Sequence, residues 1–554
     1  MADVKDPMMP DGEVSPYNTD YQVGQDNIIV NVGPFGLDIH NRVFAISGLL
    51  IIAFIALTLA FQSEIAPLFK GMLSWLTSRL DWFFLSAGNI FVLICLLLVI
   101  SPLGKVRLGG TLARPDYNYI TWFSMLFAAG MGIGLMFYGV SEPLSHFTSS
   151  MGGAIVENGV RTDSAPLNGA SGSVENATQL AMAATIYHWA LHPWAIYAFL
   201  ALGLALFSFN KGLPLTIRSL FYPLLGDAVW GWPGHLIDIL AVLATLFGLA
   251  TSLGLGASQA ASGLNFLFDV PLGQTTEIVL VIIITAIATF SVVAGLDVGV
   301  RRLSEANMIL AGLLLLFIIV VGPTMMLFSD FFSNLLSYVN YLPALSNPFS
   351  RPDSNFAAGW TSFYWAWWIS WSPFVGMFIA RISRGRTVRE FITSVLLVPS
   401  LACVLWMTVM GSTSIHQVVV EGYQNIASAI LPLQLFTMLD TLPLAKITCV
   451  VAIILVVVFF VTSADSGTLV IDIIASGGKI ESPTSQRVFW CVFEGLVAIT
   501  LILGGGLDAL QAMVVSTGLP FALVLLLASV AVIKGLMSEP RPARPQSAVR
   551  APWR

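Results

Sequence analysis

Residues 278–296 read IVLVIIITAIATFSVVAGL and contain no charged side chain. A helix rises about 1.5 Å per residue, so a stretch of this length can cross a hydrocarbon core about 30 Å thick. The whole chain is 56% hydrophobic and 10% charged, whereas roughly 25% of the residues of a soluble domain are charged. The composition therefore excludes an ordinary soluble protein and predicts an all-α membrane protein.

Apolar stretches of this kind recur along the chain, and we count about twelve. They are expected at 43–61, 84–101, 120–140, 180–207, 236–268, 278–296, 308–328, 359–380, 392–410, 447–475, 488–503 and 507–533. If the N-terminus is cytoplasmic, 20 of the 25 Lys and Arg residues fall in cytoplasmic segments, as the positive-inside rule requires. We therefore expect a multi-pass protein of the cell inner (plasma) membrane with both termini in the cytoplasm.

The segments between and beyond these spans suggest a division of the chain. The first 40 residues carry seven acids against one Lys, and we expect a disordered cytoplasmic tail there. The expected units are an acidic tail at 1–40, two extra N-terminal helices at 43–101, a first five-helix repeat at 119–328, an amphipathic linker helix at 329–356, a second five-helix repeat at 357–533 and a short basic tail at 534–554.

Helix breakers suggest that the two repeats are related. The third span contains three glycines in the five residues 130–134, and the eighth contains Ser372-Pro373. Transporters built from inverted repeats place their sites on helices interrupted at corresponding positions, and a five-helix unit reverses direction when it is repeated. The glycines are equally typical of close packing between two helices, so the symmetry stays a hypothesis.

Tryptophans gather in the middle of the eighth span, where residues 364–371 read YWAWWISW. At helical spacing Tyr364, Trp367, Trp368 and Trp371 share one face, while Trp365 points elsewhere, into packing. Belt anchoring at the membrane interface does not explain so many indoles at mid-span. A wall of aromatic rings suits a quaternary ammonium or sulfonium ion, which the negative ring faces attract.

A second aromatic group lies in the fourth span, at Trp189, Trp194 and Tyr197. These residues can line one side of a helix that a nearby proline loosens. His188 and His192 lie beside them. These histidines are either packing residues with hydrogen-bond partners or members of a proton relay.

The tenth span is interrupted by polar residues, since 459–467 read FFVTSADSG. The hydroxyls of Thr462 and Ser463 can supply the hard oxygen ligands that a small cation prefers, although such hydroxyls also bond back to their own helix. Three acids at membrane depth are functional candidates or members of structural pairs. They are Asp238, Asp465 and Glu494.

Together these features resemble the betaine/carnitine/choline transporter (BCCT) family over nearly the whole chain. The resemblance is carried by GMGIGLMFYG at 130–139 followed by Ser141-Glu142-Pro143, WAWWISWSPF at 365–374, RISRGRTVRE at 381–390 and TSADS at 462–466. It implies twelve spans, a homotrimer, and a core of ten helices with the inverted-repeat fold of sodium-coupled amino-acid carriers, the LeuT-like type.

The resemblance also implies binding residues. The substrate residues would be Trp189, Trp194, Tyr197, Gly130, Met131, Gly132, Gly134, Trp367, Trp368 and Trp371. One sodium would be bound by Ala128, Met131, Phe459, Thr462 and Ser463. A possible second sodium site matches the family at Thr245 and Phe374, but Leu249 replaces its other threonine and cannot coordinate a cation.

These residues lead us to expect a secondary active transporter rather than an enzyme. Members that resemble this one and are specific for choline carry an acid at the position of Gly134, so the glycine favours a zwitterion such as glycine betaine or dimethylsulfoniopropionate. We expect symport with sodium for osmoprotectant or nutrient uptake, contact with membrane lipid, no cofactor other than the coupling ion and no nucleic-acid partner. The alternatives are a proton-coupled choline or carnitine transporter and a small-cation channel.

Overall fold

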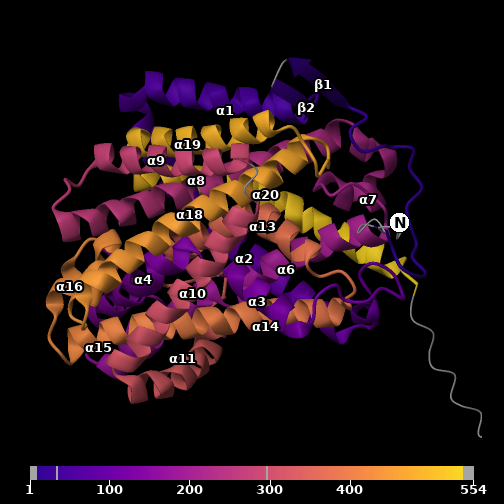
Figure 1. Ribbon diagram of the computed structural model, residues 1–554. Helices are drawn as coiled ribbons and strands as arrows, with labels where there is room; N and C mark the ends of the chain where they lie inside the picture. Colours follow the sequence, from indigo (N-terminus) through magenta and orange to yellow (C-terminus); the bar gives the residue numbers. More distant parts are fainter. Residues whose placement is uncertain (1–8, 33–34, 131, 295–296, 541–554) are drawn as a thin grey trace, which may run out of the picture.

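The computed structural model describes residues 9–32, 35–130, 132–294 and 297–540, and it is built almost wholly from helices (Figure 1). The long helices are α1 (Val43–Ala60), α2 (Gln62–Ile100), α3 (Tyr119–Gly130), α4 (Ile133–Gly152), α5 (Val174–Trp189), α6 (Leu191–Ala205), α8 (Trp232–Phe268), α9 (Gln274–Ala294), α10 (Asp297–Val321), α11 (Thr324–Leu345), α13 (Ser362–Arg381), α14 (Val388–Met407), α18 (Ala445–Ala475), α19 (Thr484–Gly505) and α20 (Leu507–Met537). The short helices are α7 (Tyr222–Leu225), α12 (Ser354–Phe356), α15 (Thr413–Val419), α16 (Gln424–Ser428) and α17 (Gln434–Asp440). Two antiparallel hairpins pair β1 (Asn27–Val32) with β2 (Phe35–His40) and β3 (Val156–Glu157) with β4 (Val160–Arg161).

The helices form the membrane protein that the composition predicts. Within the described residues, ten helical segments are long and apolar enough to cross a membrane, and the bent pair α3 and α4 makes an eleventh. The predicted eighth span is α13, which does not belong to this apolar set because Trp, Tyr and Ser take the place of aliphatic residues. The predicted amphipathic linker is α11.

Burial separates the central helices from the peripheral ones. In the apolar window of α5 and α6, 94% of the residues are buried inside the protein, against 28% for α1 and for α9. The α13 helix packs against both α6 and α8, whereas α1 and α9 lie at the upper edge in Figure 1. A helix that is apolar on all sides and still buried must face other helices. The centre of the molecule is therefore formed by α5, α6, α8 and α13.

The third span is interrupted, as its glycines predict. The α3 helix ends at Gly130, α4 begins at Ile133, and the two are bent by 65°. Gly132 is extended, with φ −165° and ψ −174°, and acts as the N-cap of α4 without a side-chain cap. The first amides of α4 therefore point out of the helix without helical acceptors.

The eighth span is not interrupted, which corrects the prediction made from Ser372-Pro373. The α13 helix runs through Pro373. The proline has no N–H for the carbonyl of Ile369, four residues earlier, but the Ser372 hydroxyl donates to that carbonyl at 2.6 Å. The serine replaces the bond that the proline removes, so the helix continues.

The fourth span breaks where a proline was expected to loosen it. The α5 helix ends at Trp189, and Ala190 leaves the helical region with φ −102° and ψ −117°. Pro193 follows within the first turn of α6. The break gives Trp189 a direction that differs from the one an unbroken helix would impose.

The N-terminal tail is ordered from residue 9 onwards, so the predicted disorder is wrong for the part that the structure describes. Asp11 pairs with Arg384 at 3.1 Å, and the Lys211 ammonium donates to the carbonyl of Ser15 at 2.9 Å and pairs with Glu539 at 2.5 Å. Two of the acids that suggested a solvated tail thus have basic partners on the loops, Asp11 with Arg384 and Asp38 with Lys479. These contacts place both ends of the described chain on one face, which we call the terminal face.

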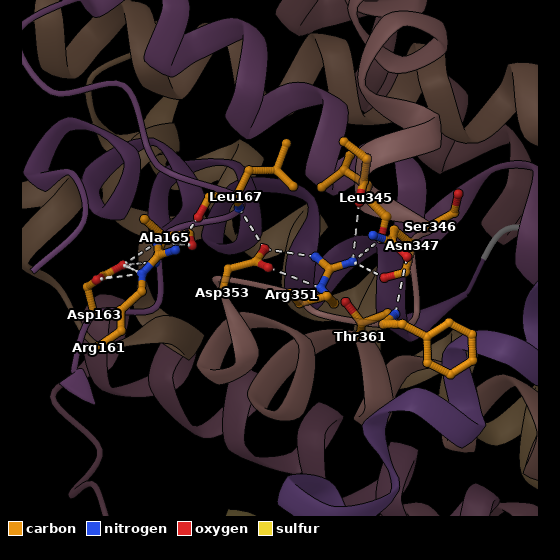
Figure 2. A network of polar contacts seen from close by, with 12 residues as sticks. Arg161, Asp163, Ala165, Leu167, Leu345, Ser346, Asn347, Arg351, Asp353 and Thr361 are labelled. Carbon is orange, nitrogen blue, oxygen red and sulfur yellow. Dashed lines mark hydrogen bonds and ion pairs between the residues drawn. The ribbon is translucent and has the colours of Figure 1, made fainter. Parts of the chain in front are cut away.

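A second polar network connects two loops, the one between α4 and α5 and the one before α13 (Figure 2). Arg161 pairs with Asp163 at 2.8 Å, and Arg351 pairs with Asp353 at 2.8 Å. The Leu167 amide donates to Asp353 at 2.6 Å and joins the loop between α4 and α5 to the one before α13. We call these five residues the loop clasp.

Candidate substrate-binding site

A cavity of about 260 Å³ lies between α3, α4, α5, α6, α10, α13 and α18. Its lining residues are Ala128, Gly132, Ile133, Gly134, Leu135, Trp189, Tyr197, Ser304, Asn307, Met308, Trp367, Trp368, Trp371, Phe374, Val375, Phe378, Phe459, Thr462, Ser463 and Ser466. None of these described residues is charged. The cavity is therefore an apolar, aromatic chamber with a few neutral polar groups.

One wall of the cavity is aromatic and joins the two groups found in the sequence. Trp368 is its centre, since its ring centroid lies 5.4 Å from that of Trp189 and 5.2 Å from that of Tyr197. Both pairs are close to perpendicular, at 81° and 63°. Trp367 and Trp371 complete the wall from the same helix. An onium ion without hydrogen-bond donors fits a chamber of this kind.

Trp194 is not among the residues that line this cavity, and its predicted place in the substrate site stays a prediction. It is fully buried, with its ring centroid 5.5 Å from that of Tyr197 and 6.3 Å from that of Trp368. The break after Trp189 rotates α6 relative to α5, so that residues on one predicted face separate. Trp194 supports the wall from behind.

Two other side chains near the wall also face away from the cavity. Tyr364 was predicted to share the face of the tryptophans, but it is fully buried and directs its hydroxyl to a carboxylate described below. Trp365 packs as predicted, stacked on His192 at 5.4 Å. His192 in turn meets the Asn89 side chain at 2.9 Å, which supports the packing interpretation of this histidine.

The interrupted third span forms a second wall, through Gly132, Ile133 and Gly134. The amides of Ile133 and Gly134 belong to the first turn of α4, where N–H groups attract anions. A Cβ at Gly134 would lie 2.6 Å from Trp189 Cη2 and 3.0 Å from Trp367 Cη2. The absence of a side chain at this position is thus what lets α4 approach the aromatic wall.

Most residues of the predicted sodium site lie at the same cavity. Ala128, Phe459, Thr462 and Ser463 line it, and Ser466 adds a hydroxyl that the sequence did not suggest. In this structure the Thr462 hydroxyl bonds back to its own helix, at 3.0 Å from the carbonyl of Val458. The back-bonding that competed with ion binding in the sequence is therefore present.

Other predicted ligands lie apart from this cavity or outside the described residues. Gly130 is the last residue of α3, and Met131 lies outside the described residues. Phe374 lines the cavity, but Thr245 does not, and its hydroxyl donates to the carbonyl of Ala241 at 2.7 Å. The described structure thus gives Thr245 and Phe374 no shared cavity.

The α10 helix contributes residues that sequence reasoning missed, namely Ser304, Asn307 and Met308. Asn307 is 3% exposed, and both polar atoms of its side chain lack a hydrogen-bond partner among the described residues. The predicted seventh span began at Met308, so the polar residues one turn earlier were assigned to a loop. Their spacing of three residues was the available signal.

The sequence also gave no separate role to Glu142, which is fully buried in α4. Its Oε2 accepts hydrogen bonds from Trp189 Nε1 at 2.7 Å and from the Tyr364 hydroxyl at 2.6 Å. Its Oε1 lies 2.6 Å from His188 Nδ1 and 3.2 Å from His146 Nε2. The spacing of four residues between Glu142 and His146 places them on one face of a helix and was the available signal. It was not used because the predicted third span ended at residue 140, before both residues. His188 is thus a hydrogen-bonded residue whose partner is a carboxylate.

The three acids at membrane depth have different surroundings. Asp238 forms a buried ion pair with Arg218, whose amide also donates to it at 2.9 Å, so the structural alternative applies. Glu494 accepts a hydrogen bond from Thr468 at 3.4 Å. Asp465 lies in α18, between the lining residues Ser463 and Ser466.

Comparison with known proteins identifies the family of this chain. The family model described as "BCCT, betaine/carnitine/choline family transporter" matches residues 42–541. A glycine betaine/proline/choline transporter of Vibrio parahaemolyticus is 67% identical over 532 residues, which cover 96% of each chain. Glycine betaine transporter 1 of the same organism is 50% identical over 94% of this chain and 98% of its own, and the glycine betaine transporter of Acinetobacter baylyi is 40% identical over 90% and 74%. The chain therefore belongs to the betaine/carnitine/choline transporter family and is a multi-pass membrane transporter, not an enzyme.

Proposed function

We propose that the chain is a sodium-coupled symporter of small quaternary ammonium or sulfonium compounds. The observation that carries the proposal is the chamber formed by Trp189, Tyr197, Trp367, Trp368 and Trp371, whose described lining has no charged group. Glycine betaine and dimethylsulfoniopropionate are the substrates we propose first. The relative that is 67% identical is named for choline and proline as well, so we propose choline as a further substrate.

The two walls of the cavity suit the two ends of a zwitterion. Each aromatic ring attracts an onium head by about 0.5–2 kcal/mol, so several rings can bind it without a carboxylate in the lining. The amides of Ile133 and Gly134 can accept the carboxylate at the other end, because the first turn of a helix carries partial positive charge.

Coupling to sodium requires oxygen ligands next to the substrate. Thr462, Ser463 and Ser466 offer hydroxyls at the cavity, close in sequence to Phe459. Thr462 can coordinate the ion through a lone pair of its oxygen while its O–H still donates to the carbonyl of Val458. Sodium that holds the α3–α4 segment in its substrate-binding form would raise substrate affinity, and the substrate would raise sodium affinity by the same factor.

The proposed cycle is alternating access between the terminal face and the face of the loop clasp. We place the protein in the inner membrane with the terminal face in the cytoplasm. The reason is that most Lys and Arg residues fall in the sequence segments expected on that side. The core would consist of two inverted five-helix repeats. Each positive charge that enters gains about 2.3 kcal/mol per 100 mV, which is enough to concentrate a zwitterion roughly tens of times.

Uptake into proteoliposomes tests the proposal. Labelled glycine betaine, choline, carnitine and dimethylsulfoniopropionate are supplied with an inward sodium gradient, an inward proton gradient or neither. We expect saturable accumulation of the onium compounds only with sodium. Accumulation driven by protons alone would favour the proton-coupled alternative, and an ohmic current without accumulation would favour a channel.

A further inference from the structure

A buried carboxylate lies one indole ring away from the cavity. Glu142 is not a lining residue, but Trp189, which lines the cavity, donates its indole N–H to Glu142 at 2.7 Å. The side chain of Glu142 is fully buried. Any charge on this carboxylate is therefore separated from a bound substrate by a single ring and not by water.

The contacts around Glu142 match the ionised form. Four polar groups face its two oxygens: the Trp189 N–H, the Tyr364 hydroxyl and one ring nitrogen each of His188 and His146. An indole only donates, and an ionised carboxylate only accepts. If each histidine is neutral and has its proton on the nitrogen that faces Glu142, all four groups donate to the carboxylate. No two donors then face each other.

The outer side of the cluster is consistent with neutral histidines. His188 Nε2 lies 3.0 Å from the Thr361 hydroxyl, which can donate to it. His146 Nδ1 has no hydrogen-bond partner among the described residues, so no acceptor there calls for a second proton on this ring. With both rings neutral, the cluster keeps one negative charge.

We propose that Glu142 determines the charge preference of the site, in a role that rests on the proposed function. Its negative charge attracts the onium group through Trp189, because a unit charge acts strongly where water is excluded. The hydrogen bond from the indole N–H to an anion also makes the ring of Trp189 more negative and a better partner for a cation. A cavity whose described lining residues are all neutral can in this way bind choline, which has a net positive charge, as well as zwitterions.

The substitution Glu142→Gln tests this role, because it removes the charge and retains the shape. Dissociation constants for choline and glycine betaine are measured on the purified full-length protein by calorimetry. We expect choline to bind about tenfold more weakly, the order of a Coulomb attraction across one ring at an effective dielectric constant of about 20. Glycine betaine, whose own carboxylate offsets the interaction, should change less than about threefold. The ratio of the two constants is the readout, because a loss of structure would weaken both ligands alike.

Two further variants make the result specific. Glu142→Asp keeps the charge and should keep the ratio of the unsubstituted protein. Glu494→Gln makes the same chemical change at another buried acid, whose described hydrogen bond goes to Thr468. This control should not change the ratio. If the Gln variant does not fold, the Asp variant alone decides, because a choline-specific loss with the charge retained would contradict the proposal.

Several outcomes would overturn the inference without touching the proposed function. An unchanged ratio in Glu142→Gln would show that Glu142 is neutral or too well screened. If the unsubstituted protein bound glycine betaine but not choline, it would show no preference for net positive charge, and the role proposed for Glu142 would be wrong. In contrast, failure of the unsubstituted protein to bind any onium compound would overturn the proposed function itself.

Discussion

Because Gly134 has no side chain, the indole rings of Trp189 and Trp367 can pack against the first turn of α4. A Cβ there would lie 2.6 Å from Trp189 Cη2, closer than such atoms approach in proteins. The neighbouring indoles are large, buried and packed on other rings, so they cannot yield at small cost.

Gly134→Ala should therefore weaken substrate binding. We expect KM for glycine betaine to rise about tenfold, since overpacking costs about 1–3 kcal/mol and here acts on the cavity wall. The measurement is uptake in proteoliposomes, with expression and melting temperature as checks. Gly312→Ala is the matched control, because a Cβ at Gly312 in α10 has nothing within 4 Å. Equal effects of the two changes would contradict the assigned role of Gly134.

Trp371 offers a test of the aromatic wall itself. Its indole N–H donates to the carbonyl of Gly248 at 3.1 Å, which fixes the ring at the cavity. Trp371→Leu removes one ring worth about 0.5–2 kcal/mol to an onium ion, so KM should rise roughly 3- to 30-fold. Trp371→Phe keeps an aromatic face and should lose less. Uptake that does not distinguish Leu from Phe would argue against binding by ring faces.

For single residues, the sequence predicts that the site is aromatic better than it predicts which residues line it. Helical spacing correctly groups Trp367, Trp368 and Trp371, because α13 is regular and its period is known. Spacing fails for Trp194, because the helix break at Ala190 changes the direction of the chain. It also fails for Tyr364, whose direction is determined by a carboxylate on another helix.

Among the elements, α13 depends on one serine for its continuity. The Ser372 hydroxyl donates to the Ile369 carbonyl that Pro373 leaves without its usual partner. Ser372→Ala leaves this buried carbonyl unpaired, which costs about 1–3 kcal/mol.

We therefore expect Ser372→Ala to lower the melting temperature of the purified protein and to reduce transport, because the helix carries the aromatic wall. Ser529→Ala provides a comparison, since the Ser529 hydroxyl donates to the Leu525 carbonyl at 3.3 Å in a part of α20 beyond Pro520. If both variants melt alike, the hydroxyl of Ser372 is not what keeps α13 intact.

The hairpin of β1 and β2 should respond to acid through His40. Burial and the nearby Arg218 lower the pKa of His40 to about 3, whereas an unfolded histidine titrates near 6.5. Because the folded-state pKa is the lower one, the neutral ring contributes stability that is present above about pH 6.5 and lost as the pH falls towards 3.

Between pH 6.5 and 5 the loss should reach up to about 2 kcal/mol. Melting temperatures of the detergent-solubilised protein across this range measure it. His40→Gln cannot gain a proton and should flatten the dependence, and an equally steep fall in that variant would assign the effect to other groups.

The elements that the sequence predicts poorly are those governed by distant partners. The apolar spans are recognisable because lipid demands continuous apolar helices. The N-terminal tail was expected to be disordered from its own composition, yet Asp11 and Ser15 find Arg384 and Lys211, hundreds of residues away. The continuity of α13 is likewise invisible to a rule that treats Pro373 without its neighbour Ser372.

For the whole molecule, α11 carries an apolar stripe with no partner in the described chain. Phe328, Phe332, Leu336 and Val339 follow helical spacing and are 56–69% exposed. We propose that the chain forms a homotrimer, as the family resemblance implies, and that this stripe lies in the contact between copies.

The double substitution Phe332→Glu with Leu336→Glu should convert the trimer to monomers, because each acid would have to be buried without a partner. Native mass spectrometry, with a protomer of 59.7 kDa, measures the change. Val156→Glu with Val160→Glu places the same charges on exposed positions of the β3–β4 hairpin, outside the membrane spans, and is the control. A trimer that survives the change in α11 would place the interface elsewhere.

The position of Lys211 has a consequence for how the chain matures. This one ammonium group contacts the carbonyl of Ser15 and the carboxylate of Glu539. A ribosome produces residue 15 long before residue 539, and chains begin to fold from the N-terminal side as they emerge. The contact between Ser15, Lys211 and Glu539 therefore cannot be complete until α20 has been synthesised and inserted.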